Sequence, residues 1–213
     1  FNSMEGRKLK PDVIIFSAVV SACEKGGQWE KALDLFNSME AHQLEPNIVT
    51  LNAAISACEK TAQWEKALEL FNSMESRKLK PDVIIISAVI SACGEVGQWE
   101  KALELFNSME GRKLKPDVII FSAVVSACEK GGQWEKALDL FNSMEAHQLE
   151  PNVVTLSAVI SACEKAGQWE KALELFNSME GRGVQPNVIS FSASISACEK
   201  VGHWEKALEL FNS

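Results

Sequence analysis

A strict internal repeat of 35 residues constrains this 213-residue chain more than any other feature. All six prolines keep this step: Pro11, Pro46, Pro81, Pro116, Pro151 and Pro186. The six cysteines, from Cys23 to Cys198, and the six tryptophans, from Trp29 to Trp204, keep it too. Self-similarity at such a period indicates a repeat architecture in which each repeat is one supersecondary unit. A larger period of three repeats lies on top of it, because residues 1–47 recur unchanged as residues 106–152, which indicates duplication.

Within each repeat the apolar residues follow a helical spacing twice. In residues 13–47 the first stripe is Phe16, Val19, Val20 and Cys23, and the second is Trp29, Ala32, Leu33, Phe36 and Met39. Gly26-Gly27 predicts the end of the first helix. Pro46 predicts a turn before the next helix, because proline cannot continue one. Each repeat is therefore predicted to be an antiparallel helical hairpin.

One such hairpin cannot bury enough apolar surface to offset its conformational entropy, so the hairpins must stack. This predicts an all-α solenoid, with the tryptophan series filling the seam between helices. Residues 1–12 are interpreted as the C-terminal part of a preceding repeat. Full repeats are predicted at 13–47, 48–82, 83–117, 118–152 and 153–187, and a truncated sixth repeat at 188–213. Because both ends fall inside a predicted second helix, we expect further repeats or association of the ends.

The formal net charge of −8 argues against a protein that binds nucleic acid mainly through bulk charge. This charge is compatible with a protein that recognises nucleic-acid bases. Much of the acidic charge is predicted on the outer surface of the second helices: Glu30, Asp34, Glu65 and Glu69. The longest apolar run, residues 13–23, is far shorter than the ~20 residues of a membrane-spanning helix.

The cysteines and histidines do not have the spacing of a metal or catalytic site. There is no Cys-x-x-Cys pair, and equivalent cysteines in stacked hairpins would lie about 10 Å apart, beyond the ~7 Å that a disulfide can bridge between Cα atoms. Reduced thiols in the core are the expectation. The three histidines are scattered, and no glycine-rich phosphate loop or recurring acid/base pair is present. We therefore expect no enzyme, no metal and no cofactor.

The repeat resembles that of pentatricopeptide repeat (PPR) proteins of the plain, P-type, 35-residue kind. The segment from Pro11 through DVIIFSAVVSACEKGGQWEKALDLFNSMEAHQLEPN has that unit length, the glycine between helices, the Ala-Leu and Leu-Phe core and the Pro-Asp or Pro-Asn close. Tetratricopeptide repeats have a shorter unit and usually a tyrosine, which this chain lacks. The resemblance implies a right-handed α-solenoid that binds single-stranded RNA along its first helices, one base per repeat.

In this family two side chains per repeat select the base. The resemblance places these base-reading residues as the pairs Ser17 with Asn47, Asn52 with Asp82, Ser87 with Asp117, Ser122 with Asn152, and Ser157 with Asn187, followed by Ser192 without a partner. We expect this row of small polar side chains to be open to solvent. An aliphatic residue three positions before each serine or asparagine is expected to clamp the bases: Ile14, Val49, Ile84, Ile119, Val154 and Ile189. Five lysines are expected to face the phosphates, a series that Glu95 interrupts: Lys25, Lys60, Lys130, Lys165 and Lys200.

Donor and acceptor chemistry turns these pairs into a predicted RNA sequence. An ionised aspartate only accepts hydrogen bonds, so it suits the N–H edge of guanine or uracil, whereas asparagine can also donate to the bare ring nitrogen of adenine or cytosine. By family behaviour, serine leaves room for a purine and Asn52 favours a pyrimidine. The five complete pairs then predict 5′-AUGAA-3′. Asp12 adds G or U before this core, and Ser192 adds a purine after it.

Three alternatives stay open at this stage. The solenoid could be a protein-interaction scaffold, including a subunit of a ribonucleoprotein complex with other proteins as partners. The alternating Asp and Asn residues could simply cap helices. The aliphatic series could be ordinary packing at a helix start. Family habit favours a role in organellar RNA processing, stability or translation in mitochondria or plastids, with no membrane and no small-molecule substrate; this chain shows no targeting segment.

Overall fold

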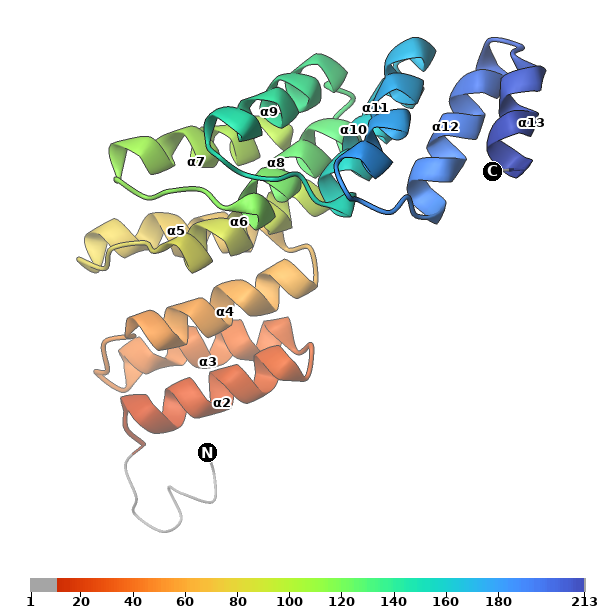
Figure 1. The fold of residues 1–213 in the computed structure, drawn as a ribbon. Helices are drawn as coiled ribbons and strands as arrows, with labels where there is room; N and C mark the ends of the chain where they lie inside the picture. Colours follow the sequence, from red (N-terminus) through yellow and green to blue (C-terminus); the bar gives the residue numbers. More distant parts are fainter. Residues whose placement is uncertain (1–10, 213) are drawn as a thin grey trace. The chain divides into compact units, whose positions relative to one another are not determined.

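The computed structural model of the chain describes residues 11–212. They form two helices per repeat, here called helix A and helix B. The helices A are α2 (Val13–Lys25), α4 (Ile48–Lys60), α6 (Val83–Glu95), α8 (Val118–Lys130), α10 (Val153–Lys165) and α12 (Val188–Lys200). The helices B are α3 (Trp29–Ala41), α5 (Trp64–Ser76), α7 (Trp99–Gly111), α9 (Trp134–Ala146), α11 (Trp169–Gly181) and α13 (Trp204–Asn212). No strand occurs in the described residues, so the expected all-α fold of tandem hairpins is confirmed (Figure 1). Most of the segment 1–12, interpreted as the end of a preceding repeat, lies outside the described residues.

The chain divides into two compact units, Phe1–Ala92 and Cys93–Ser213, each with the same packing scheme. In the first unit α2 packs against α3 and α4, and α4 packs against α3 and α5. In the second unit α8 packs against α7, α9 and α10, and α10 packs against α8, α9, α11 and α12. Within a unit, each helix A therefore contacts its own helix B, neighbouring helices A and the helix B that precedes it.

Helix A ends where the glycine pattern predicts. In repeat 1 it ends at Lys25, and Gly27 follows with a φ of 66°. The backbone N–H of Gln28 then donates to the Cys23 carbonyl oxygen over 2.9 Å, which closes the last turn. In repeat 2 the corresponding residue is Ala62, with a φ of 56°, and the corresponding hydrogen bond is kept.

Most positions of the predicted apolar stripes form the core, but Val19 is 38% exposed, and Cys23, Trp29 and Leu33 are half-buried. Phe16 and Val20 from α2, and Ala32, Phe36 and Met39 from α3, are buried. Packing against the helix of a neighbouring repeat buries these stripes: Val124 and Cys128 of α8, against which α7 packs, are 0% exposed.

The tryptophans were expected to fill the seam between helices as core residues, but they are less buried than that. Trp99 and Trp169 contact the following repeat. The members from Trp29 to Trp169 are half-buried, and Trp204 is exposed. Trp99 shows why: a Cβ on Gly131 would lie 2.2 Å from its Cδ1, so the indole rests on the glycine backbone of the next repeat. The Lys136 ammonium group covers the same ring at 4.7 Å from its centroid. The Trp99 ring thus lies at the edge of the contact between repeats 3 and 4.

The cysteines from Cys58 to Cys198 are buried free thiols, and Cys23 is half-buried. Burial raises the pKa of Cys58, Cys93, Cys128 and Cys163 to about 11 in each case. No described helix has the length and apolar character needed to cross a lipid bilayer.

We predict that the buried thiols resist modification in the native protein. Near pH 8 a thiol with a pKa of about 11 is almost entirely protonated, and the thiolate is the reactive form. Intact-mass analysis after alkylation should show Cys23 modified first and Cys58, Cys93, Cys128 and Cys163 modified only in denaturant. Equal, rapid modification of these cysteines under native conditions would contradict the stacked core.

Candidate nucleic-acid interface

The start of every helix A carries a large aliphatic side chain exposed to solvent. The second residue of each helix A is 53–75% exposed: Ile14, Val49, Ile84, Ile119, Val154 and Ile189. In contrast, the next residue in α8, Ile120, is 0% exposed. Packing at the helix start therefore does not account for these side chains. Clamping of bases by this aliphatic row stays a prediction.

Two positions before each of these aliphatic residues, an aspartate or asparagine caps helix A. In all six cases the side-chain Oδ1 accepts a hydrogen bond of 2.9–3.0 Å from the backbone N–H of the third helical residue: Asp12, Asn47, Asp82, Asp117, Asn152 and Asn187. The capping alternative is thus a real property of these residues. Because only one oxygen is needed for the cap, the other atom of each carboxylate or amide group can serve a second purpose.

The predicted reading residues on helix A are less open than expected. Ser17, Ser122 and Ser157 are only 3–8% exposed, Asn52 and Ser87 are half-buried, and Ser192 is exposed. The cause is the first turn of the following helix A, which covers the serine. Ser17 Oγ lies 2.6 Å from Thr50 Oγ1 and 2.7 Å from the Val13 carbonyl oxygen, and Ser122 has the same arrangement with Thr155 and Val118.

The structure nevertheless brings two predicted reading pairs into direct contact. Ser157 donates to Asn187 Oδ1 over 3.0 Å. Ser122 Oγ lies 3.4 Å from Asn152 Oδ1, but its single proton has closer acceptors in the Val118 carbonyl oxygen at 2.7 Å and Thr155 Oγ1 at 2.6 Å. In repeat 2, Asn52 Oδ1 is buried without a hydrogen-bond partner among the described residues. Ser87 belongs to the first unit and Asp117 to the second.

Sequence reasoning missed three buried hydroxyl groups next to the asparagine caps. Thr50, Thr155 and Ser190 are 0% exposed and are the third residues of their helices. Thr50 and Thr155 donate to the Oδ1 of Asn47 and Asn152 over 3.0 and 3.1 Å. A signal for them exists in the sequence: a hydroxyl residue follows each asparagine cap at this spacing, whereas isoleucine follows each aspartate cap.

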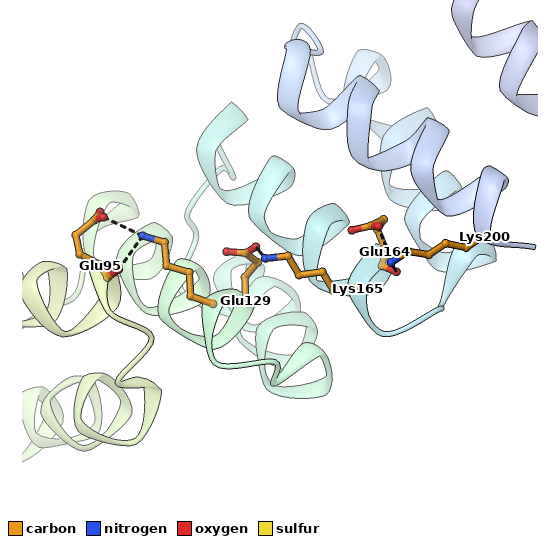
Figure 2. Close-up of polar contacts among 6 residues, drawn as sticks. Glu95, Glu129, Glu164, Lys165 and Lys200 are labelled. Carbon is orange, nitrogen blue, oxygen red and sulfur yellow. Dashed lines mark hydrogen bonds and ion pairs between the residues drawn. The ribbon is translucent and has the colours of Figure 1, made fainter.

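Four of the lysines predicted to face phosphates form ion pairs with the preceding repeat. Lys60 pairs with Glu24. Lys165 pairs with Glu129, and Lys200 with Glu164 over 2.7 Å (Figure 2). In repeat 3 a glycine, Gly94, replaces this glutamate, and Lys130 pairs instead with Glu95 over 2.9 Å. Lys25 is exposed. A phosphate would have to compete with these carboxylates, so the lysines are weaker phosphate ligands than the sequence alone suggests.

The remaining charge lies elsewhere. Glu30, Asp34, Glu65 and Glu69 of the helices B are exposed, as expected. Residues 11–212 contain no group of three or more histidine, cysteine or acidic side chains arranged to hold a metal ion.

Two family models match the sequence. The model described as the pentacotripeptide-repeat region of PRORP matches residues 50–213, and that of the PPR repeat family matches residues 11–60. A comparison with curated proteins found no match.

Solved structures share the fold. The pentatricopeptide repeat protein PPR10 from maize is 25% identical with a TM-score of 0.67, over 91% of this chain and 28% of that one. PPR10 in complex with an 18-nt psaJ RNA element gives 25% identity and a TM-score of 0.66, over 96% and 28%. The PPR domain of Arabidopsis thaliana protein-only RNase P 1 in complex with tRNA is 14% identical with a TM-score of 0.71, over 89% and 96%. The chain thus spans about 28% of the length of PPR10.

We predict that Asn152→Ala destabilises the second unit by about 1–2 kcal/mol, because the helix loses its cap and the buried Thr155 hydroxyl loses an acceptor. Asn152→Asp keeps the acceptor oxygen and should cost only a few tenths of a kcal/mol. Urea unfolding followed by circular dichroism measures both. Asn142→Ala, at an exposed position of α9, is the matched control and should be neutral or slightly stabilising. Equal losses for Asn152→Ala and Asn152→Asp would contradict the capping geometry.

Proposed function

Because the chain belongs to the pentatricopeptide-repeat family, we propose that it binds single-stranded RNA along the helix-A face, one base per repeat. The observation that carries the proposal is the juxtaposition, in each repeat, of an exposed aliphatic side chain and a capping aspartate or asparagine. Apolar side chains that stay exposed at a fixed position indicate a contact with another molecule. The complexes of maize PPR10 with an RNA element and of the Arabidopsis PPR domain with tRNA support RNA as that molecule.

The cap geometry supports base reading by the aspartates and asparagines. Each cap uses Oδ1 to bind its helix start, which leaves an aspartate with a second acceptor oxygen and an asparagine with an NH₂ donor. An acceptor suits guanine or uracil, and a donor suits adenine or cytosine. The serines then act from beneath, as small residues that leave space for a purine and that contact the cap. The predicted core remains 5′-AUGAA-3′.

The distribution of charge favours binding through bases over binding through phosphates. The helices B present acidic side chains, and the helix-A lysines are largely paired with glutamates. Affinity is therefore expected to depend only weakly on salt, since few phosphate contacts release few counterions. Repulsion between RNA phosphates and the acidic side chains of the helices B also favours binding along the helices A.

We further propose that the chain is a binding module and not an enzyme, and that its role is in organellar RNA processing, stability or translation. Family expectation supports mitochondria or plastids as its location. In Arabidopsis thaliana protein-only RNase P 1, the part that matches this chain is the PPR domain, in complex with tRNA. This match supports RNA binding as the property that the two proteins share.

We predict that RNA containing AUGAA binds more tightly than RNA of equal length containing UACUU, as measured by fluorescence anisotropy. Asn47→Asp should shift the preference at the first base from A toward G by about tenfold and leave the other bases unchanged, because a donor becomes an acceptor. Asn37→Asp, at an exposed position of helix B in the same repeat, adds the same charge and is the control. Equal affinities for both RNAs, or none for either, would favour the protein scaffold.

We also predict that the Glu129–Lys165 ion pair limits phosphate binding. Glu129→Gln should free the lysine, raise RNA affinity several-fold at low salt and steepen the log–log salt dependence by about 0.7, the slope of one single-strand phosphate contact. Lys165→Gln should not raise the affinity. The control is the α11 pair of Lys171 and Glu174, 2.8 Å apart, where Glu174→Gln should leave the slope unchanged. An unchanged slope for Glu129→Gln would remove Lys165 from the phosphate-facing residues.

A further inference from the structure

We propose that the buried hydroxyls of Thr50 and Thr155 are positioning residues that restrict the neighbouring asparagine cap to hydrogen-bond donation toward its base. This inference rests on the proposed RNA-reading function and deepens it. It assigns part of the base preference to side chains that RNA cannot touch, because Thr50 and Thr155 are 0% exposed.

The first support is the pairing of residue types at the start of helix A. Each asparagine cap is followed three residues later by a hydroxyl: Asn47 by Thr50, Asn152 by Thr155, and Asn187 by Ser190. Each aspartate cap is followed at the same spacing by isoleucine: Asp12 by Ile15, Asp82 by Ile85, and Asp117 by Ile120. Repeats 1 and 4 are copies, but Asn187 with Ser190 is a separate instance in a diverged repeat. The hydroxyl therefore accompanies the amide and not the carboxylate.

The second support is the number of donors that reach the amide oxygen. Asn47 Oδ1 accepts from the Thr50 backbone N–H over 2.9 Å and from the Thr50 hydroxyl over 3.0 Å. Asn152 Oδ1 accepts from the same two groups of Thr155 over 2.9 and 3.1 Å. A carbonyl oxygen has two lone pairs, so both are occupied. The NH₂ group is then the hydrogen-bonding group of the asparagine side chain that remains for a base.

The serine beneath completes this arrangement. Ser17 Oγ lies 2.6 Å from Thr50 Oγ1 and 2.7 Å from the Val13 carbonyl oxygen, and its single proton goes to one of these two acceptors. In the proposed relay, Ser17 donates to Thr50, and Thr50 donates to Asn47 Oδ1 over 3.0 Å. This relay requires the Ser17 proton to point to Thr50 and not to the Val13 carbonyl oxygen. In the third instance, Ser157 supplies the hydroxyl to Asn187 Oδ1 over 3.0 Å, while Ser190 Oγ accepts the Asn187 backbone N–H. Two donors on the amide oxygen are thus common to all three asparagine caps.

The consequence concerns which wrong base is rejected. An asparagine whose Oδ1 keeps a spare lone pair could accept from the N–H of guanine as well as donate to adenine, and would discriminate poorly. When threonine occupies that lone pair, a guanine N–H meets no acceptor, and an unpaired polar group at a binding site is costly. At the aspartate caps isoleucine supplies no hydroxyl, so the carboxylate keeps its full accepting capacity for guanine or uracil.

The test is Thr50→Val, which keeps the branched shape and removes the hydroxyl. Binding is measured with RNA containing AUGAA and with RNA containing GUGAA, which differ only at the first base. The wild type should prefer A, and Thr50→Val should narrow this preference about three- to tenfold, mainly through tighter binding of the G-containing RNA. Thr50→Ser keeps a hydroxyl at this position and should therefore keep the wild-type preference for A.

Thr155→Val is the matched control, because the same change beside Asn152, the last residue of repeat 4, should alter discrimination only at the fourth base, between AUGAA and AUGGA. Thermal unfolding of each variant shows whether it is folded. If the wild type discriminates and Asn47→Asp reverses its preference, but Thr50→Val leaves the ratio unchanged or weakens both RNAs equally, this inference is overturned and the proposed function stands. If the wild type does not distinguish A from G at the first base, both are overturned.

Discussion

Stacking between neighbouring hairpins is the interaction on which the rest of this structure depends. Equivalent side chains show its effect: Phe176 and Leu173 of α11, which packs against α12, are 7% and 9% exposed. Phe211 and Leu208 occupy the same positions in α13, which contacts no later hairpin within the described residues, and they are 77% and 52% exposed. The helix-B stripe is thus buried mainly by the next repeat. Cooperation between neighbours, and not the single hairpin, supplies the apolar core.

Stacking also creates the polar interior of the helix-A face. The first turn of one helix A lies over the middle of the preceding one and encloses Ser17 beneath Thr50 and Ser122 beneath Thr155. Buried hydroxyls are tolerated because they bond to one another and to the caps. The cap residue starts a helix with one oxygen. Under the proposed function it has a second task, which is to contact a base with its other side-chain atom. Aspartate and asparagine both meet the first task, which leaves the choice between them available for the second.

The sequence predicted the features that repeat locally and not those that depend on register between repeats. The helix bounds, the glycine turns and the capping role of residues such as Asn47 follow from the apolar spacing and from residue chemistry within a few positions. The burial of Ser17 under Thr50 joins residues separated by 33 positions, and the Lys60–Glu24 ion pair joins residues separated by 36. A period of 35 residues means that equivalent residues recur, but it does not determine the offset of one helix along its axis relative to the next helix.

Register explains the charge arrangement as well. A lysine at the end of helix A reaches back to the glutamate of the preceding repeat, whose side chain is only 13–16% exposed in the pairs of Lys60, Lys165 and Lys200. Where Gly94 removes that carboxylate, Glu95 takes over as the partner of Lys130, so the link between repeats survives the change. Exposed ion pairs contribute little free energy of unfolding. Under the proposed function their greater effect is on RNA binding, because lysines paired with glutamates attract phosphate only weakly, which would leave base selectivity to the caps.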